Sequence, residues 1–235
     1  MKKNNVLFSI VIVCFNEQAA ISNVIKDLIK ELDKIKISYE ILAVDNGSLD
    51  NTGKIIDKIA KANSRVRKIK VYVNQGKGNG VIEGLKSARG QILGFMDGDN
   101  QMDVKYLINC LNLIIGKKGN VLSKGWRKIR HDNLWRKIVS FFYNLIMNKF
   151  LNIKAKDINC FPKLFTRQLY NLMAPLESKD WFIDAEIMIK AKKNNAKIYE
   201  TPIIFKKRKG GNSSVNLLTI LEFIKNIIRF KLRNF

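Results

Sequence analysis

The stretch ILGFMDGDNQ, residues 92–101, ends an apolar run with two aspartates that flank one glycine. In a turn, the carboxylates of Asp97 and Asp99 reach one small volume, and Gly98 between them lets a ligand approach the backbone closely. Carboxylates held this close repel each other unless a cation neutralises them. Hard oxygen ligands suit Mg²⁺ or Mn²⁺, with open positions left for diphosphate oxygens, and Gln101 could add a neutral oxygen.

The same segment has a second, purely structural interpretation. An acidic turn is also typical of a helix start, and Asp103 is a further candidate cap. Because short motifs of this kind often occur by chance, the two aspartates alone leave the metal site and the helix cap equally open.

Three further segments carry polar groups of interest. Asp45 in VDNGSLDNTG ends an apolar run, where an acceptor can bind a base N–H or a ribose hydroxyl, although the segment alone is typical of a turn with Asp50 as a cap. In NQGKGNG, Lys77 could approach a phosphate, but the glycine spacing fits no nucleotide-binding motif, and the segment alone favours a flexible surface turn. The single histidine, His131, has charged neighbours, and no G-x-S-x-G elbow supplies a serine, which excludes Ser-His-Asp hydrolysis.

The elements that position these groups follow from hydrophobic patterning. Four short, nearly continuous apolar runs predict strands covered on both faces, at residues 8–15, 39–45, 69–74 and 91–97. Apolar residues spaced by three or four predict helices between them, over 21–35 and around 55–59. This alternation predicts a parallel sheet with helices on both faces, whose ligands bind beyond the carboxyl ends of the strands. Four polar positions lie at those ends: Asn16-Glu17, Asp45, Asn74 and Asp97.

The second half of the chain is less regular. We expect helices over 133–150 and 181–196, a strand over 197–205 and a basic loop over 206–214. The last segment, 216–235, places apolar residues on one stripe and cations opposite, the pattern of an amphipathic helix that lies on a membrane surface or packs on the core or a partner.

Composition sets further bounds. The 235 residues suit one globular domain, and the net charge of +23 is concentrated in residues 116–235, which carry 26 basic and 8 acidic residues. Such a surface suits a polyanion, either an anionic membrane or nucleic acid. Three scattered cysteines indicate reduced thiols in the cytosol. The amino-terminal apolar run ends in Asn16-Glu17 without a cleavage site and is interpreted as a strand, and no uncharged run of about 20 residues suggests a transmembrane helix.

Taken in order, these segments resemble family 2 glycosyltransferases, which have the GT-A fold, and most closely their dolichol-phosphate mannose synthase-like branch of polyprenyl-phosphate sugar synthases. CFNE is similar to the family's aromatic-Asn-Glu segment, which implies nucleotide contacts from Phe15 and Glu17. VDNGSLDNT matches its Asp-Asp-Gly-Ser-x-Asp-x-Thr block. Since Asn46 replaces the second aspartate, the resemblance implies a base contact only from Asp45, with Ala43 beside it.

The remaining motifs extend the resemblance nearly to the end of the chain. NQGKGNG matches the family's Asn-x-Gly-Lys-Gly turn, which adds Lys77 to the donor site, and MDGDNQ is similar to its Asp-x-Asp metal motif with the following glutamine. Segments around Asp157 and Asp184 match family blocks. SKGWRK and ETPIIFKKRKGGNSS imply that Arg127 and Arg208 face phosphates. Where the mannose synthases have a Ser-Lys pair after the second arginine, this chain has Ser213-Ser214, so the role of that lysine does not carry over.

The resemblance implies a GT-A domain over 1–215, with a nucleotide-binding half (1–115) and an acceptor-binding half (116–215), before the helix at 216–235. It implies a metal-dependent, inverting transfer of a hexose from a GDP- or UDP-linked donor to a polyprenyl phosphate at the cytoplasmic membrane face. Such an acceptor is already an anionic nucleophile, because the second pKa of a phosphate lies near ~6. Asp157 and Asp184 are then candidate positioning groups, or else a loop cap and a solvated helix face.

Two alternatives remain from the sequence. A related glycosyltransferase could extend a saccharide or lipid-linked oligosaccharide, whose hydroxyl acceptor would demand a true general base. A non-enzymatic protein could bind nucleic acid, but the basic run KKRKGG lacks aromatic stacking platforms beyond Phe205, so no nucleic-acid partner is expected.

Overall fold

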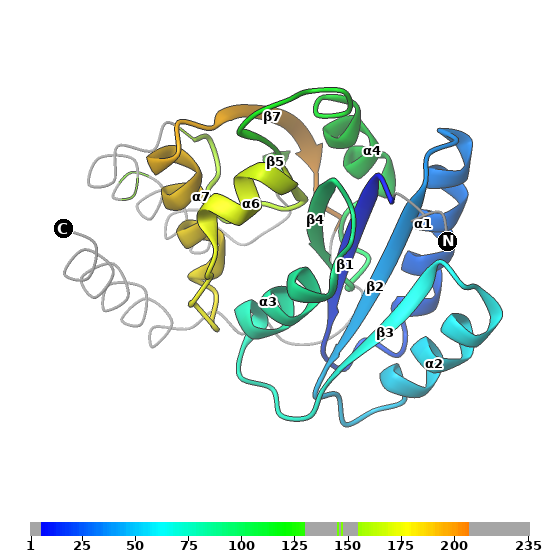
Figure 1. The fold of residues 1–235 in the computed structure, drawn as a ribbon. Coiled ribbons are helices and arrows are strands. Elements are labelled where there is room, and N and C mark those ends of the chain that lie inside the picture. Colours follow the sequence, from blue (N-terminus) through cyan, green and yellow to red (C-terminus); the bar gives the residue numbers. More distant parts are fainter. Residues whose placement is uncertain (1–5, 130–144, 146, 148–154, 207–235) are drawn as a thin grey trace.

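The computed structural model describes residues 6–129, 145, 147 and 155–206. They build a seven-stranded sheet with the order β3-β2-β1-β4-β6-β5-β7 (Figure 1). The strands are β1 (Phe8–Cys14), β2 (Tyr39–Asn46), β3 (Val66–Val71), β4 (Ile92–Asp97), β5 (Val121–Ile129), β6 (Lys163–Thr166) and β7 (Lys197–Ile204). The described helices are α1 (Ile21–Lys34), α2 (Thr52–Ala62), α3 (Lys77–Ser87), α4 (Val104–Asn112), α6 (Arg167–Met173) and α7 (Ile183–Lys193).

The sheet is mostly parallel, as predicted. β1 pairs with β2 and β4, β2 with β3, and β5 with β7, all in parallel, whereas β6 runs antiparallel to both β4 and β5. Helices α1, α2 and α4 contribute to the apolar core on one face, and α3, α6 and α7 to the core on the other (Figure 1). The sheet is therefore covered on both sides, which explains why its central strands are continuous apolar runs.

Local patterns account for most of these elements. In α1 the buried residues follow the i, i+3, i+4, i+7, i+11 pattern of one helix face, so this face packs on the sheet while the charged face remains outside: Ile21, Val24, Ile25, Leu28 and Leu32. The predicted helix at 181–196 and strand at 197–205 are confirmed as α7 and β7. The three cysteines are buried and unpaired. Three expected elements lie wholly or largely outside the described residues: the helix at 133–150, the basic loop at 206–214 and the helix at 216–235.

The predicted position of the third strand is wrong. We expected it over 69–74, but β3 spans Val66–Val71 and pairs along its whole length with the end of β2. Beyond that point β2 turns away at Gly47, which has a positive φ of 77°, so the chain has no strand to pair with. Tyr72 and Val73 are consequently 82% and 66% exposed, and their β-branched and aromatic types misled the sequence interpretation.

The glycine-rich segment before α3 makes a close backbone contact. The amides of Gly78 and Asn79 donate to the carbonyl oxygens of Asp180 and Lys179, at 3.2 and 2.9 Å. A Cβ at Gly78 would overlap the carbonyl oxygen of Ser178. These glycines therefore allow segment 178–180, which precedes α7, to pack on the first turn of α3 and occupy N–H groups that an anion would otherwise need.

This contact yields a prediction for Gly78→Ala. Alanine normally favours a helix over glycine by about 1 kcal/mol, but here the added methyl group must push backbone aside. We expect the free energy of unfolding to fall by about 1–3 kcal/mol, measured by urea denaturation. Lys86→Ala, at an exposed position of the same helix, is the matched control and should change it by less than about 0.5 kcal/mol. Equal stability of the two variants would contradict the packing argument.

Candidate active site

The carboxyl end of the sheet collects acidic side chains around the end of β1. In the strand register, Asp45 lies opposite Cys14 and Asp97 opposite Val13, one on each neighbouring strand. Burial raises the pKa of the Cys14 thiol well above its ordinary value, and Glu17, Asp45, Asp97 and Asp99 raise it further. The predicted positions thus come together, and they create a negative potential at this end of the sheet.

The loops after β1 and β2 hold each other in place. Asn16 adopts a positive φ of 55°, its amide donates to Ser48 Oγ at 3.1 Å, and its side-chain oxygen accepts from Leu49 N at 2.8 Å. The Glu17 amide donates to Thr52 Oγ1 at 2.8 Å. This arrangement leaves Phe15 44% exposed beside the acidic strand ends, where a flat ligand could contact its ring.

Asp45 is buried and already hydrogen bonded. Its Oδ1 accepts from the Ser48 amide at 3.1 Å, and its Oδ2 lies 3.9 Å from the Lys68 ammonium and against Gly53. Ala43, which the resemblance placed beside the base, is fully buried in the core. Its side chain therefore belongs to the packing of β2, and the contact of Ala43 with the nucleotide stays a prediction.

Lys77 lies inside the site and not on a surface turn. Its Nζ is 2.9 Å from Asp97 Oδ1, and its side chain is only 7% exposed. Burial by itself lowers the pKa of Lys77, but Asp184 and Asp97 outweigh burial and hold this pKa above its ordinary value. The expectation of a flexible turn is wrong because segment 178–180 covers the glycines on either side of this lysine.

Asp184 joins Lys77 to a second buried lysine, Lys163. Asp184 Oδ2 lies 3.5 Å from Lys77 Nζ, and its Oδ1 accepts a hydrogen bond from the Lys163 ammonium. Burial raises the pKa of Asp184, but the two lysines outweigh it and lower this pKa, so the carboxylate stays ionised. The alternative of a solvated helix face is wrong, since Asp184 is 1% exposed.

Lys163 was not predicted as a site residue. It begins β6, is 0% exposed, and donates to the Cys160 carbonyl oxygen at 2.9 Å. Burial lowers the pKa of Lys163 to about 8, and the Asp184 carboxylate opposes this shift only in part. Its one sequence signal is a lysine inside the apolar run CFPKLF, a position that a soluble strand gives to a charged residue only when a partner is buried with it.

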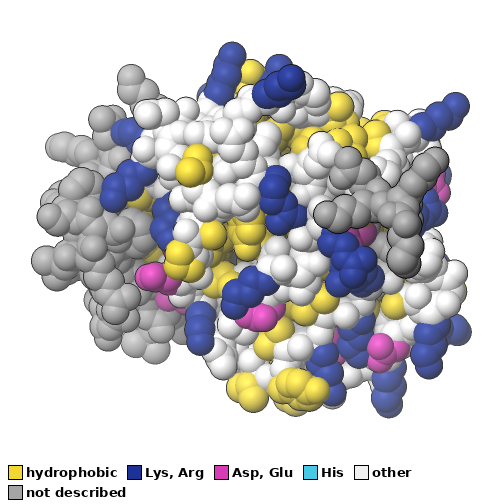
Figure 2. Space-filling model, viewed as in Figure 1, with side chains coloured by type: hydrophobic (Ala, Val, Ile, Leu, Met, Phe, Trp, Pro, Cys, Tyr) yellow, Lys and Arg dark blue, Asp and Glu magenta, His cyan; other side chains and the backbone are white. Residues whose placement is uncertain are grey.

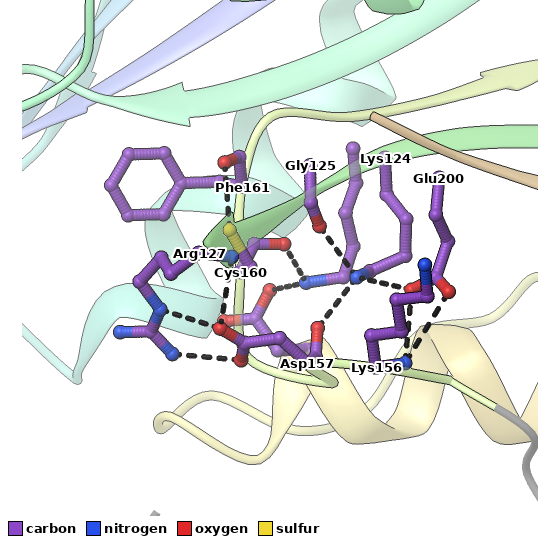
Figure 3. A network of polar contacts seen from close by, with 10 residues as sticks. Lys124, Gly125, Arg127, Lys156, Asp157, Cys160, Phe161 and Glu200 are labelled. Carbon is purple, nitrogen blue, oxygen red and sulfur yellow. Dashed lines mark hydrogen bonds and ion pairs between the residues drawn. The ribbon is translucent and has the colours of Figure 1, made fainter. Parts of the chain in front are cut away.

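Arg127 and Asp157 form a two-pronged ion pair at the far end of β5 (Figure 3). Arg127 Nε donates to Asp157 Oδ2 at 2.6 Å and an Nη donates to Oδ1 at 2.8 Å. Beside them, the buried Lys124 ammonium donates to the carbonyl oxygens of Gly125 and Asp157, at 2.6 and 2.5 Å, and lies 3.3 Å from Glu200 (Figure 3). Asp157 is thus more than a loop cap: it orients Arg127, the arginine that the resemblance implies faces a phosphate.

The segment 177–181 is tied to α7 by Glu186. The Glu186 carboxylate is 0% exposed, accepts from the amides of Glu177 and Ser178, and pairs with Lys190 at 2.8 Å. At the end of this segment the Trp181 ring lies 5.2 Å from the Lys77 ammonium and is 39% exposed. An aromatic ring therefore borders the site at the point where α3 and α7 meet.

The paired aspartates have the chemistry of a cation site. Asp97 and Asp99 offer hard oxygen ligands within a negative potential, and the Lys77 ammonium already acts as a stand-in cation on Asp97. The Gln101 amide donates to Asp99 Oδ1 at 3.1 Å, while its side chain donates to the Lys206 carbonyl oxygen at 3.3 Å. No cluster of three acidic, histidine or cysteine ligands occurs among the described residues. Two carboxylates still fit Mg²⁺, which takes its remaining ligands from water and substrate phosphates.

The helix-cap alternative is also realised, but at neighbouring residues. Asp103 Oδ1 accepts from the Lys105 amide at 3.0 Å and caps α4, and Asp50 Oδ1 accepts from the Thr52 amide at 2.9 Å at the start of α2.

Arg208 and His131 lie outside the described residues. Across the described ranges, no helix is both long enough and apolar enough to span a bilayer.

Comparison with known proteins agrees with this geometry. The family described as "Glycosyl transferase family 2" matches residues 9–173, which include β1, β2, β4 and their acidic ends. The chain belongs to glycosyl transferase family 2. As a member of this family the chain is a glycosyltransferase, and the alternative of a non-enzymatic nucleic-acid-binding protein is wrong.

Relatives lie in the branch that the resemblance indicated. A dolichyl-phosphate beta-glucosyltransferase of Dictyostelium discoideum is 26% identical over 98% of this chain and 75% of its own length. A dodecaprenyl-phosphate galacturonate synthase of Rhizobium johnstonii is 26% identical over 75% of this chain and 53% of its own length. The chain spans 36% of a further relative, the glycosyltransferase AglD of Haloferax volcanii.

Solved structures confirm the GT-A fold. Glucosyl-3-phosphoglycerate synthase from Mycobacterium tuberculosis, solved in complex with Mn²⁺, UDP and glucosyl-3-phosphoglycerate, superposes with a TM-score of 0.68. The match covers 92% of this chain and 75% of that chain at 19% identity.

The buried position of Lys163 predicts a pH dependence of stability. Its folded pKa of about 8 lies below the ordinary 10.5, so between these values the unfolded chain binds more protons than the folded chain. The free energy of unfolding should therefore increase as the pH rises from about 8 to 10.5. We expect the difference between the native chain and Lys163→Met to increase by up to about 3 kcal/mol from pH 8 to 10.5, measured by urea denaturation. The corresponding difference for the exposed Lys86→Met should stay flat, and a flat difference for Lys163→Met would contradict the assignment.

Proposed function

We propose that this glycosyltransferase moves a hexose from a GDP- or UDP-linked donor to a polyprenyl phosphate, with inversion at the anomeric carbon. The observation that carries the proposal is that both candidate general bases are neutralised by cations. Asp157 is held by the Arg127 fork, and Asp184 lies between Lys77 and Lys163. An acceptor that brings its own negative charge needs neither of them as a base.

The donor would bind over the carboxyl ends of β1, β2 and β4. Phe15 and Asp45 are the groups proposed to contact the nucleoside, with Glu17 beside them. Asp97 and Asp99 would hold Mg²⁺ or Mn²⁺, and Gly98 between them leaves room for the diphosphate. When bound, the metal would supply positive charge to the departing diphosphate. A neighbouring structure of the mycobacterial synthase contains Mg²⁺ and UDP, which supports this choice of ion and ligand.

The acceptor would approach from the side of β5 and α7. Arg127 is oriented by Asp157, and Arg208 is proposed as the second phosphate-binding arginine. A guanidinium held in a fixed orientation recognises a phosphate at two oxygens at once. One relative is named a dolichyl-phosphate beta-glucosyltransferase and another a dodecaprenyl-phosphate galacturonate synthase. Both names contain a polyprenyl phosphate, which supports such an acceptor for this chain as well.

A polyprenyl acceptor requires contact with a membrane surface. The net charge of +23 favours an anionic leaflet, and Figure 2 shows lysine and arginine side chains spread widely over one face with few acidic ones. We propose a peripheral position on the cytoplasmic face, with the amphipathic segment 216–235 against lipid or a membrane-embedded partner.

The metal and donor assignments predict loss of transfer in Asp99→Ala. Membranes with polyprenyl phosphate, Mg²⁺ or Mn²⁺, and a panel of radiolabelled UDP- and GDP-sugars should yield an organic-phase product with one donor. Removing one group that stabilises developing charge should lower the rate by about 10²-fold or more. Asp103→Ala, which removes only the cap of α4, is the control and should retain most of the rate. Unchanged organic-phase counts for Asp99→Ala would refute the assignment.

The alternative of a saccharide or lipid-linked oligosaccharide acceptor makes a different prediction for Asp157→Asn. This change keeps the shape and volume of the side chain but removes any general base at position 157. With a phosphate acceptor, the rate should fall by no more than about 10-fold and keep its pH profile, whereas loss of a general base costs about 10²–10⁴-fold. Steady-state rates across pH 5–9 measure both features, and a thermal melt verifies folding. A larger fall, together with loss of the rise in rate as pH increases through the pKa of the base, would favour the hydroxyl acceptor.

A further inference from the structure

The Lys77 ammonium lies where a metal ion would have to compete with it. Nζ is 2.9 Å from Oδ1 of Asp97 and donates to Oδ2 at 3.2 Å, so it contacts both oxygens of the proposed metal ligand. A carboxylate neutralised on both oxygens offers little charge to a divalent ion. A second cation at the same carboxylate would also be repelled by the ammonium.

The surroundings keep this ammonium charged and close to its carboxylates. The rings of Phe161 and Trp181 lie 4.8 and 5.2 Å from Nζ, and that of Phe95 lies 6.0 Å away. Aromatic faces stabilise a cation but carry no net charge. The carboxylates that form ion pairs with Lys77 in the described structure are those of Asp97 and Asp184.

The backbone of Lys77 is fixed, so only its side chain can respond to a ligand. The amides that follow it are hydrogen bonded to segment 178–180, which pins the first turn of α3. Asp184 is neutralised independently by Lys163 and does not lose its only counter-ion when Lys77 moves. The lysine can therefore leave Asp97 without leaving a buried carboxylate unpaired, a condition that would otherwise be strongly destabilising.

We propose that Lys77 is the counter-cation of Asp97 in the donor-free protein and competes with the divalent ion for it. A nucleoside diphosphate then relieves the competition, because its oxygens give the ammonium another anionic partner. Metal and nucleotide consequently bind with positive cooperativity, and the free protein has a low metal affinity. This inference rests on the proposed function, since it takes Asp97 as a metal ligand.

The test measures Mn²⁺ binding to the full chain without nucleotide. The electron paramagnetic resonance signal of free Mn²⁺ reports how much of the ion stays unbound. Lys77→Met keeps an apolar side chain among the three rings but removes the charge. It should bind Mn²⁺ at least about 10-fold more tightly than the native chain, a difference of about 1.4 kcal/mol. Lys86→Met, in the same helix and paired with Glu83 on the surface, should bind within about twofold of the native chain. Circular dichroism verifies that each variant is folded.

Further measurements separate the competition by Lys77 from the proposed metal site itself. Adding UDP or GDP should tighten Mn²⁺ binding more in the native chain than in Lys77→Met, and adding Asp97→Asn to Lys77→Met should abolish the gain. If the native chain binds Mn²⁺ with nucleotide but Lys77→Met alone is no tighter than the native chain, the competition is refuted and the metal site stands. If neither protein binds Mn²⁺ with or without UDP and GDP, the proposed metal site fails and the competition fails with it.

Discussion

The neutralisation of negative charge at the carboxyl end of the sheet is the constraint on which this structure depends. Asp97 at the end of β4 is balanced by Lys77 from α3, which also pairs with Asp184 of α7. Lys163 from β6 neutralises the same Asp184. Removing one partner of a buried ion pair typically costs about 3–5 kcal/mol. Helices α3 and α7, which are far apart in the sequence, are therefore coupled by electrostatics as well as by packing on the shared sheet.

The glycine spacing near Lys77 serves this coupling. A glycine-rich turn before a helix usually exposes N–H groups that bind phosphate. Here two of these amides donate to Lys179 and Asp180 carbonyl oxygens, so the glycines bring a distant segment close and bury the lysine. Phosphate recognition in the proposed site must then depend on side chains, above all on arginines such as Arg127, which Asp157 orients.

The sequence predicted what depends on local patterns. Apolar runs located β1, β2 and β4, and spacing located α1, because both signals lie within a few residues. The convergence of Asp45 and Asp97 also followed, since parallel strands end at one edge. The burial of Asp184 and Lys163 did not follow, because each appears polar until its partner 21 residues away is known. The end of β3 was missed for a related reason: strand length there is set by the partner strand and not by residue type.

In the proposed reaction, substrate binding exchanges ion pairs instead of creating new buried charge. A diphosphate that takes Lys77 from Asp97 replaces a carboxylate–ammonium pair with a phosphate–ammonium pair of similar strength. The vacated Asp97 carboxylate would then be able to hold the metal in place of the ammonium. Because each cation keeps an anion and each anion a cation, desolvation changes little at each step, whereas either ligand arriving alone would leave one charge unbalanced. The same charge balance that stabilises the fold thus favours joint binding of donor and metal.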